Sequence, residues 1–478
     1  MPINVQGDKE FDKITSIQNK ALRINLNENI YGTFAEIGAG QETVRNFFRA
    51  PNPSGTIAKT MSAYDKDFSD AIYGAEPAKR YVTEPRLKAM MAYETGLIEK
   101  RISRLKHPNK LFFSFANTVA TIDWAKKYKG HGWIGIRFQT KPKEEYSEII
   151  LHVQLHENKA AQQQISLGIM GVNLIYAAYY HHDDPKVLLK RLYDHLSADK
   201  IEVDTINFTG PAFKDVDNRL MSLQLVKNGM TDAVMFAPSG NNVLPANVLY
   251  KKNILTLRGS FRPVTKVNIS MYEKSLRMFM EDHDIQRAAT EVIFEITLFN
   301  LKGEGDEIDE RDFLNRADLL CALGHTVMIS NFQQYYKVVN YFAQFTSEQI
   351  GLTMGVTTLQ DIFDNKYYTN LSGGILEAFG SLFARNVNIY LYPSRDEETA
   401  EIYTTKNLRV NNNTRGLYNF FKQNDRIINI TDYDEETLDI NSRKVHEMIT
   451  EEKSGWEDML PEKVTDLIKT QQMFRKKN

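Results

Sequence analysis

Glycine-rich turns and strand-borne carboxylates are the features of this chain whose residue types and spacing could do chemistry. Ser372-Gly373-Gly374 opens an apolar helix and leaves bare backbone amides at the positive end of its dipole. We expect this turn to bind a phosphate group. The structural alternative is that the two glycines only permit a sharp turn and close helix packing.

Polar side chains recur where predicted strands end, which is where α/β sheets place their sites. Arg258 and Arg262 follow the predicted strand Ile254–Leu257 and could clamp a charged group bidentately. Asn207, Asn241 and Asn331 hold similar positions and are expected to orient polar groups of a ligand. The alternative is that these asparagines only favour turns.

Two carboxylates, Glu295 and Asp204, lie inside otherwise apolar runs. A buried carboxylate is costly unless it is paired. Each is therefore either bridged to a cation or available as a catalytic acid or base.

The histidines do not predict a metal site. His152 and His156 would share a strand face about 13 Å apart, too far for one ion. We predict no dedicated metal site, and Mg²⁺ only together with a phosphate ligand. The sequence identifies no other cofactor.

The stretch FAEIGAGQETVRNFF contains Glu36-x-Gly38-x-Gly40, which is similar to the first glycine-rich loop of S-adenosylmethionine-dependent methyltransferases. Such a loop needs a buried strand before the glycines. The preceding residues, NLNENIYGTF, make a poor strand. We therefore expect a tightly packed helix start, with a cofactor loop as the alternative.

Short apolar runs alternate with helical patterns from about residue 110, which indicates an α/β fold with a mixed, largely parallel sheet. The predicted strands are Leu111–Ala116, Trp133–Phe138, Ile149–Leu155, Ile201–Phe208, Ala233–Phe236, Ile254–Leu257, Val292–Leu298, Thr326–Ile329, Leu352–Val356 and Val387–Leu391. Trp133–Phe138 and Ile149–Leu155 look like a hairpin. An open doubly wound sheet and an irregular barrel both fit this spacing.

Three regions are expected along the chain. Residues 1–108 form a helical or irregular N-terminal region whose hydroxyl-rich segment 51–74 is a candidate lid loop or subunit contact. Residues 109–393 form the α/β core, and residues 394–478 a charged C-terminal appendage.

Composition narrows the class of protein. The net charge is −2 over 478 residues, without the basic excess of a nucleic-acid-binding protein. There is one cysteine, and the first residues lack the pattern of a secretory signal. We predict a cytoplasmic homo-oligomer with neither a nucleic-acid partner nor a membrane partner.

Four stretches resemble a bacterial family of similar length whose members carry two names, nicotinate-nucleotide adenylyltransferase and TonB-dependent receptor. They are ALRINL…YGTFAEIGAGQETVRNFFRA, SGTIAKTMSAYDKDFSDAIYG, GPAFKDVDNRLMSLQLVKNGMTDAVMF and LSGGILEAFGSLF. The resemblance covers nearly the whole chain. The receptor name implies an outer-membrane barrel of alternating strands. The adenylyltransferase name implies an H-x-G-H element, and Gly130-His131-Gly132-Trp133 lacks the second histidine.

These observations favour an enzyme, a transferase rather than a redox enzyme, that binds a phosphorylated small molecule such as a nucleotide. Ser372, Gly373 and Gly374 would hold the phosphate, and Glu295 or Asp204 would act as acid or base. The first alternative is a non-catalytic assembly protein on an enzyme-like fold. The second is an S-adenosylmethionine-dependent methyltransferase.

Overall fold

The computed structural model describes residues 15–77, 79–302, 307–384 and 386–475, and it divides the chain into two compact units, Met1–Thr231 and Asp232–Asn478. Each unit has its own sheet. The chain is therefore α/β throughout, and the single division near residue 231 differs from the expected boundaries at residues 108 and 393.

The first unit contains a six-stranded mixed sheet in the order β2-β1-β3-β4-β5-β6. Its strands are β1 Ile30–Gly38, β2 Ile57–Ala63, β3 Leu111–Ala120, β4 Gly130–Phe138, β5 Ser147–Leu155 and β6 Ile201–Thr209. β2, β1 and β3 are parallel, and β3 to β6 are antiparallel. The expected hairpin is confirmed as the β4–β5 pair.

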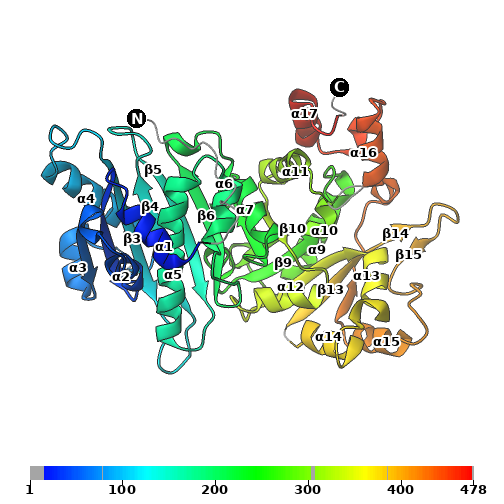
Figure 1. Cartoon of the computed structure of the whole chain (residues 1–478). Coiled ribbons are helices and arrows are strands. Elements are labelled where there is room, and N and C mark those ends of the chain that lie inside the picture. The colour runs from blue at the N-terminus through cyan, green and yellow to red at the C-terminus, as the bar shows by residue number, and fades with distance from the viewer. Residues whose placement is uncertain (1–14, 78, 303–306, 385, 476–478) are drawn as a thin grey trace. The chain divides into compact units, whose positions relative to one another are not determined.

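Helices cover both faces of this sheet (Figure 1). They are α1 Ile17–Asn25, α2 Glu42–Arg49, α3 Lys66–Tyr73, α4 Glu84–Arg101, α5 Ala160–Tyr180, α6 Pro185–Leu192 and α7 Asn218–Lys227. A Cβ on Gly171 of α5 would meet Thr43 of α2 and Phe115 of β3, so α2 and α5 share one face. A Cβ on Gly135 of β4 would meet Met91 of α4, which covers the other face.

The N-terminal region is not only helical. β1 and β2 lie within residues 1–108, and β1 is flanked on both sides by parallel strands. The predicted lid loop 51–74 contains β2 and α3. It is therefore largely a regular part of the first unit, not a structureless loop.

The second unit contains an eight-stranded sheet in the order β16-β13-β12-β9-β10-β11-β7-β8. Its strands are β7 Ala233–Phe236, β8 Asn242–Val243, β9 Asn253–Arg258, β10 Thr290–Thr297, β11 Thr326–Ser330, β12 Ile350–Gly355, β13 Val387–Tyr392 and β16 Ile427–Asn429, and β14 Ser394–Arg395 pairs with β15 Ile402–Tyr403 as a separate ribbon.

Six neighbouring strands of this sheet are parallel, from β16 through β11. The chain runs from β9 through β10 to β11 on one side, then returns to β12, β13 and β16 on the other. This is the 3-2-1-4-5-6 strand order of a doubly wound sheet. Both sheets have free edges, so the open alternative is correct and the barrel is wrong.

Helices also cover both faces of the second sheet. They are α8 Pro245–Leu249, α9 Lys266–His283, α10 Leu298–Leu301, α11 Glu310–Ala322, α12 Tyr335–Phe342, α13 Val356–Ile362, α14 Gly374–Leu382, α15 Arg415–Gln423, α16 Ser442–Thr450 and α17 Glu462–Gln471. One core cluster joins the sheet to α12, α13, α14 and α15. On the opposite face, Phe279 of α9 packs on Tyr390, and Phe313 of α11 on Phe236.

The charged segment 394–478 is part of the second unit. It supplies β16 to the sheet, and its helices α16 and α17 are the red helices of Figure 1. Among the described residues, no helix has both the length and the apolar character that crossing a bilayer requires.

Candidate functional sites

Two pockets open at the carboxyl edge of the second sheet. One, of about 390 Å³, lies at the ends of β9, β10, β11 and β12, and a second of about 460 Å³ lies beside it. Asn300, just after β10, lines both pockets, so they meet at this residue. The strand order reverses between β9 and β12, and this reversal is where doubly wound sheets open a crevice.

The 390 Å³ pocket, which we call the aromatic pocket, combines rings with polar groups. Its aromatic side chains are Phe299, Tyr335, Tyr367 and Tyr368. Gln334 also lines it, and the buried Oε1 atom of Gln334 has no hydrogen-bond partner among the described residues. The pocket therefore offers flat apolar surfaces to a ligand.

Arg258 lines the aromatic pocket but is already paired. Its guanidinium binds both oxygens of the fully buried Glu295, at 2.8 and 2.9 Å, and lies 4.3 Å from the Tyr335 ring centre. Burial alone would lower the pKa of Arg258, but the Glu295 carboxylate outweighs it and raises that pKa. Ser330 donates a further hydrogen bond to Glu295 at 2.5 Å.

This pairing corrects the acid–base role predicted for Glu295. Both of its oxygens accept hydrogen bonds from protein donors, so it is the structural partner of Arg258. Arg258, in turn, presents a fixed guanidinium edge, whose Nη1 atom donates to the Gln333 carbonyl at 3.1 Å.

The 460 Å³ pocket, which we call the anion pocket, is lined by cations from three parts of the unit. Arg262 follows β9, Arg316 lies on α11 and Arg443 lies in the first turn of α16. The Arg262 side chain donates to Asp312 at 2.7 Å, and Asp312 also pairs with Arg316. Arg262 and Arg316 thus share the Asp312 carboxylate, and Arg443 adds a further guanidinium group to the lining.

Arg316 is the most deeply buried of these cations, with 1 % of its surface exposed. Its Nη1 atom donates to the carbonyls of Asn300 and Ser260, at 2.7 and 3.2 Å. Its Nε atom is buried and has no hydrogen-bond partner among the described residues. A buried donor without a partner is costly.

Helix α16 closes the anion pocket from the C-terminal segment. Its N-cap Asn441 and its first residues Ser442 and Arg443 line the pocket, which adds the positive end of a helix dipole. His446, one turn further, also lines it. Burial, together with Arg262 and Arg316, lowers the pKa of His446 to about 4, and Asp312 opposes them.

The predicted phosphate turn at Ser372-Gly373-Gly374 is occupied by the chain itself. The Gly373 amide donates to the Glu377 carboxylate at 2.8 Å, so a side chain of α14 already holds the place of an anion. Gly374 has a φ of +56°, a backbone conformation that glycine adopts readily, so the turn itself accounts for a glycine at this position. The structure therefore favours the structural alternative for this turn.

The other predicted site residues are dispersed. Asn241 lies in the turn between β7 and β8, and the Asn331 amide donates to the Asp232 carbonyl at 2.9 Å. Asn207 and Asp204 lie on β6 of the first unit. Of the predicted set, only Arg258 and Arg262 line the two pockets at the carboxyl edge.

The glycine-rich motif of the first unit does follow a strand, contrary to our expectation. β1 ends at Gly38 and α2 begins at Glu42. A Cβ on Gly40 would lie 1.8 Å from the Asn117 side-chain oxygen, and a Cβ on Gly38 2.0 Å from the Val119 carbonyl. Close packing against β3 thus explains both glycines, which supports the expected packed helix start.

Beneath this turn lies Glu36, a fully buried carboxylate. It stands between Ser62 on β2 and Asn117 on β3, and neither of its oxygens has a hydrogen-bond partner among the described residues. Burial raises the pKa of Glu36, and the nearby Val44 amide and Ser62 hydroxyl, which do not reach hydrogen-bond geometry, offset only part of that effect and leave the pKa at about 8. Glu36 is therefore protonated at neutral pH.

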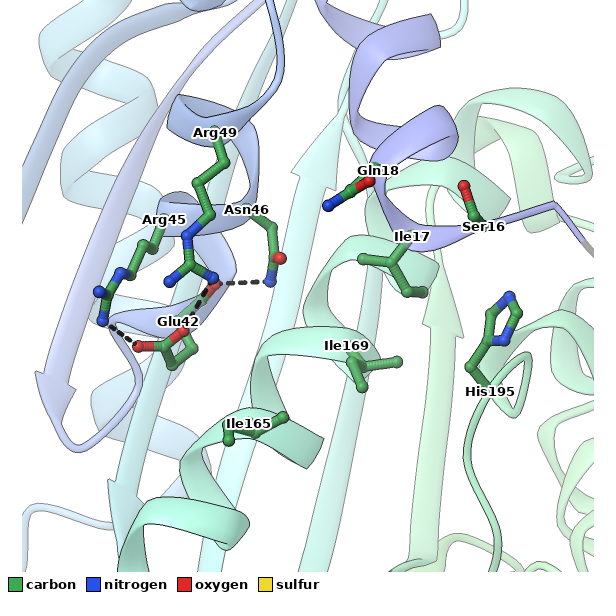
Figure 2. A pocket seen from close by; sticks show the side chains of 10 residues that line it. All are labelled: Ser16, Ile17, Gln18, Glu42, Arg45, Asn46, Arg49, Ile165, Ile169 and His195. Atoms are coloured by element: carbon green, nitrogen blue, oxygen red, sulfur yellow. Dashed lines mark hydrogen bonds and ion pairs between the residues drawn. The ribbon is translucent and has the colours of Figure 1, made fainter.

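A further pocket of about 480 Å³ lies on the helical face of the first unit (Figure 2). Ile17, Ile165 and Ile169 form its apolar wall. The guanidinium groups of Arg45 and Arg49 opposite them both pair with Glu42, at 2.8 and 3.9 Å, so their charge is partly used. Over the residues that the structure describes, no three acidic, histidine or cysteine side chains are grouped to hold a metal ion.

No family model and no curated protein matches the sequence. Solved structures similar to the chain include the competence/damage inducible protein CihA from Agrobacterium tumefaciens, at 12% identity over 34% of this chain and 94% of that one, with a TM-score of 0.25. A competence-damaged protein (CinA) superfamily protein from Enterobacter cloacae matches at 9% identity over 35% and 92% of the two chains, with a TM-score of 0.24.

Sequence reasoning missed two arginines and one histidine of the anion pocket. Arg443 and His446 come from a segment expected only to cover the core. Arg316 gave a usable signal, because it lies on the same helical face as the apolar Phe313 and Leu320. A charged residue on an apolar stripe indicates a buried ion pair, which Asp312 four residues earlier provides.

Proposed function

We propose that the second unit is an enzyme domain that binds a phosphorylated, nucleotide-like small molecule at the carboxyl edge of its sheet. The observation that carries this proposal is the meeting of the aromatic and anion pockets at Asn300, beside the reversal of strand order. A ring binds the first pocket and a phosphate the second. Doubly wound sheets place nucleotides in this crevice.

The cation set supports a phosphate rather than a neutral ligand. Arg443 is exposed at a helix N-terminus, and Arg262 shares the Asp312 carboxylate with Arg316. Guanidinium groups bind phosphate oxygens by charge-assisted hydrogen bonds. Any Mg²⁺ would enter with the phosphate.

We propose group transfer rather than hydride transfer. The turn after β9 reads Arg258-Gly259-Ser260-Phe261-Arg262, with one glycine. The dinucleotide fingerprint has three glycines in this turn, which let the backbone approach a pyrophosphate. Here guanidinium groups replace that backbone contact.

The test is calorimetric titration of the full chain with pyrophosphate, AMP, ATP and adenosine. Arg443→Gln should weaken pyrophosphate and AMP binding about tenfold, the cost of one charge-assisted hydrogen bond. Lys444→Gln is the matched control, because this neighbouring lysine pairs with Glu397 at 2.9 Å and does not line the pocket. Tyr367→Ala should weaken AMP but leave pyrophosphate binding unchanged.

The outcome against this proposal is the absence of binding to every phosphorylated probe. Concentration-dependent assembly in light scattering, together with that absence, would favour the non-catalytic assembly protein. Equal losses in Arg443→Gln and Lys444→Gln would show that the anion pocket does not hold the phosphate.

A further inference from the structure

Three side chains that the proposed function leaves unused form a hydrogen-bonded line across the first sheet. His131 on β4 contacts His152 on β5, with Nδ1 and Nε2 separated by 3.2 Å. His152 in turn contacts Asp204 on β6, its Nδ1 atom lying 2.8 and 3.0 Å from the two carboxylate oxygens. The line runs from a buried carboxylate to a partly exposed imidazole.

The contacts determine which nitrogens carry protons. The Asp204 carboxylate only accepts, so Nδ1 of His152 donates to it. Nε2 of a neutral His152 then has a lone pair and accepts from Nδ1–H of His131. The remaining nitrogen, Nε2 of a neutral His131, bears no proton and is a free base.

The backbone is shaped to make this line. The pairing of β5 with β6 shifts register between His152 and Val153, and Asp204 is the extra residue on β6 between their partners Thr205 and Val203. An extra residue in one strand re-aims its side chain and departs from regular pairing. Here it points the Asp204 carboxylate at His152.

The surroundings fix the inner members of the line. His152 is 1 % exposed and its ring lies 4.9 Å from the Trp133 ring, while Gln154 donates to the second Asp204 oxygen at 3.2 Å. A buried carboxylate held by two donors keeps its charge at little cost. The inner pair is therefore ready to stabilise a positive imidazole.

The outer histidine is neutral at ordinary pH. Burial, and to a lesser extent the neighbouring His152, lower the pKa of His131 to about 4 against a smaller opposing effect of Asp204. A proton bound at Nε2 of His131 need not stay there. Transfer of the Nδ1 proton to His152 moves the positive charge beside the Asp204 carboxylate. The negative carboxylate stabilises that charge.

We propose that the first unit has a second, general-base site in which His131 removes a proton from a water molecule or a hydroxyl group. The O–H bond of the nucleophile breaks, its proton binds Nε2 of His131, and the Nδ1 proton of His131 passes to Nε2 of His152. The electron pair remains on the nucleophile oxygen, which attacks an electrophilic carbonyl and displaces the carbonyl π electrons onto its oxygen. These electrons re-form the carbonyl as the bond to the leaving group breaks, and the proton returns through His152 and His131 to that leaving group. His152 and Asp204 are positioning residues.

A second histidine–carboxylate pair provides a matched control. His156, just after β5, contacts Glu202 of β6 at 2.9 Å. Their side chains are 30 % and 21 % exposed, and among the described residues no second imidazole contacts His156. It is a half-exposed hydrogen-bonded pair at the same two strands.

The first experiment uses p-nitrophenyl acetate as the electrophile and the full chain as catalyst. Hydrolysis should fall about tenfold or more in His131→Gln, the usual contribution of a general base being at least that large. Asp204→Asn should lower the rate and change its pH profile, while His156→Gln should leave both unchanged. Equal hydrolysis by the wild type and His131→Gln would overturn the proposal.

The second experiment needs no variant and so is independent of folding. Nitrogen-15 chemical shifts of the labelled wild-type protein identify the protonated nitrogen of each imidazole. The expected result is a proton on Nδ1 of both His131 and His152 at pH 7. A proton on Nε2 of His131 would remove the base and contradict the proposal, whatever the hydrolysis assay gives.

Discussion

Glu295 holds Arg258 by two parallel hydrogen bonds at the carboxyl end of the second sheet, with the carboxylate fully buried. Breaking such a pair by removing one partner leaves an uncompensated buried charge. We predict that Glu295→Gln lowers the free energy of unfolding by about 3–5 kcal/mol. Urea denaturation, followed by a probe in the second unit, measures it.

The control for this prediction is Asp364→Asn in the same unit. Asp364 pairs with Lys366 at 2.8 Å on the surface, where an ion pair contributes little. If Glu295→Gln lowered the free energy of unfolding as little as Asp364→Asn does, the buried pair would not stabilise the fold in the way that we predict.

The buried Glu36 should make the first unit less stable in alkaline solution. Its pKa is raised to about 8 when folded, from an ordinary value of 4.5, so between these pH values the folded state holds a proton that the unfolded state has lost. Stability therefore falls as the pH rises through this window and levels off above it. Each pKa unit by which the folded and unfolded states differ changes the free energy of unfolding by about 1.4 kcal/mol.

Glu36→Gln removes this titration while keeping the shape of the side chain. Urea midpoints of the first unit should therefore depend less on pH between 5 and 9, and above pH 8 the variant should be the more stable protein. Glu28→Gln, at an exposed position, should keep the wild-type slope. Parallel curves for Glu36→Gln and the wild type would contradict the prediction.

Two glycine substitutions in the first unit should change its stability in opposite directions. Gly40→Ala should destabilise it by about 1–3 kcal/mol, because the added Cβ would meet the buried Asn117 side chain. Gly96→Ala, inside α4 with nothing within 4 Å of its Cβ position, should stabilise the helix by about 0.5–1 kcal/mol. Thermal unfolding of both variants measures the difference, and a neutral Gly40→Ala would show that the turn is not tightly packed.

Anion binding should draw a proton onto His446. The pKa of this histidine is about 4 because of burial and of Arg262 and Arg316, and an anion between these groups offsets their charge and raises it. Sulfate is a suitable probe because its own charge is constant above pH 4. We predict that the protein takes up protons when sulfate binds near pH 5, so that the calorimetric heat of binding varies with the ionisation heat of the buffer. This dependence on the buffer should be absent in His446→Gln.

Much of the fold was predictable because apolar runs report buried strands directly. All ten predicted strands are present, extended by a few residues at some ends, while the predicted last residues Leu298 and Val356 instead begin α10 and α13. β1 was missed because Gly32 and three asparagines depress its strand pattern. The structure explains the glycine, since a Cβ on Gly32 would overlap the Phe113 side chain of the neighbouring strand.

The candidate sites were less predictable because they depend on long-range contacts. Arg258 and Arg262 could be placed at a strand end from the local pattern. Their partners Glu295 and Asp312 lie 37 and 50 residues later, and nothing local indicates that these pairs form. The alignment of Asp204 with His152 depends on a register shift of one residue, which an alternating pattern does not reveal.

Helix α16 gives the anion pocket an order of assembly. Arg262 and Arg316 are synthesised well before Arg443 and His446, which complete the pocket from residues 442–450. Domains generally fold as units while the chain leaves the ribosome. A nascent second unit that already has its parallel strands would still lack one wall of this pocket, so an anion can stabilise the unit fully only after α16 has been synthesised.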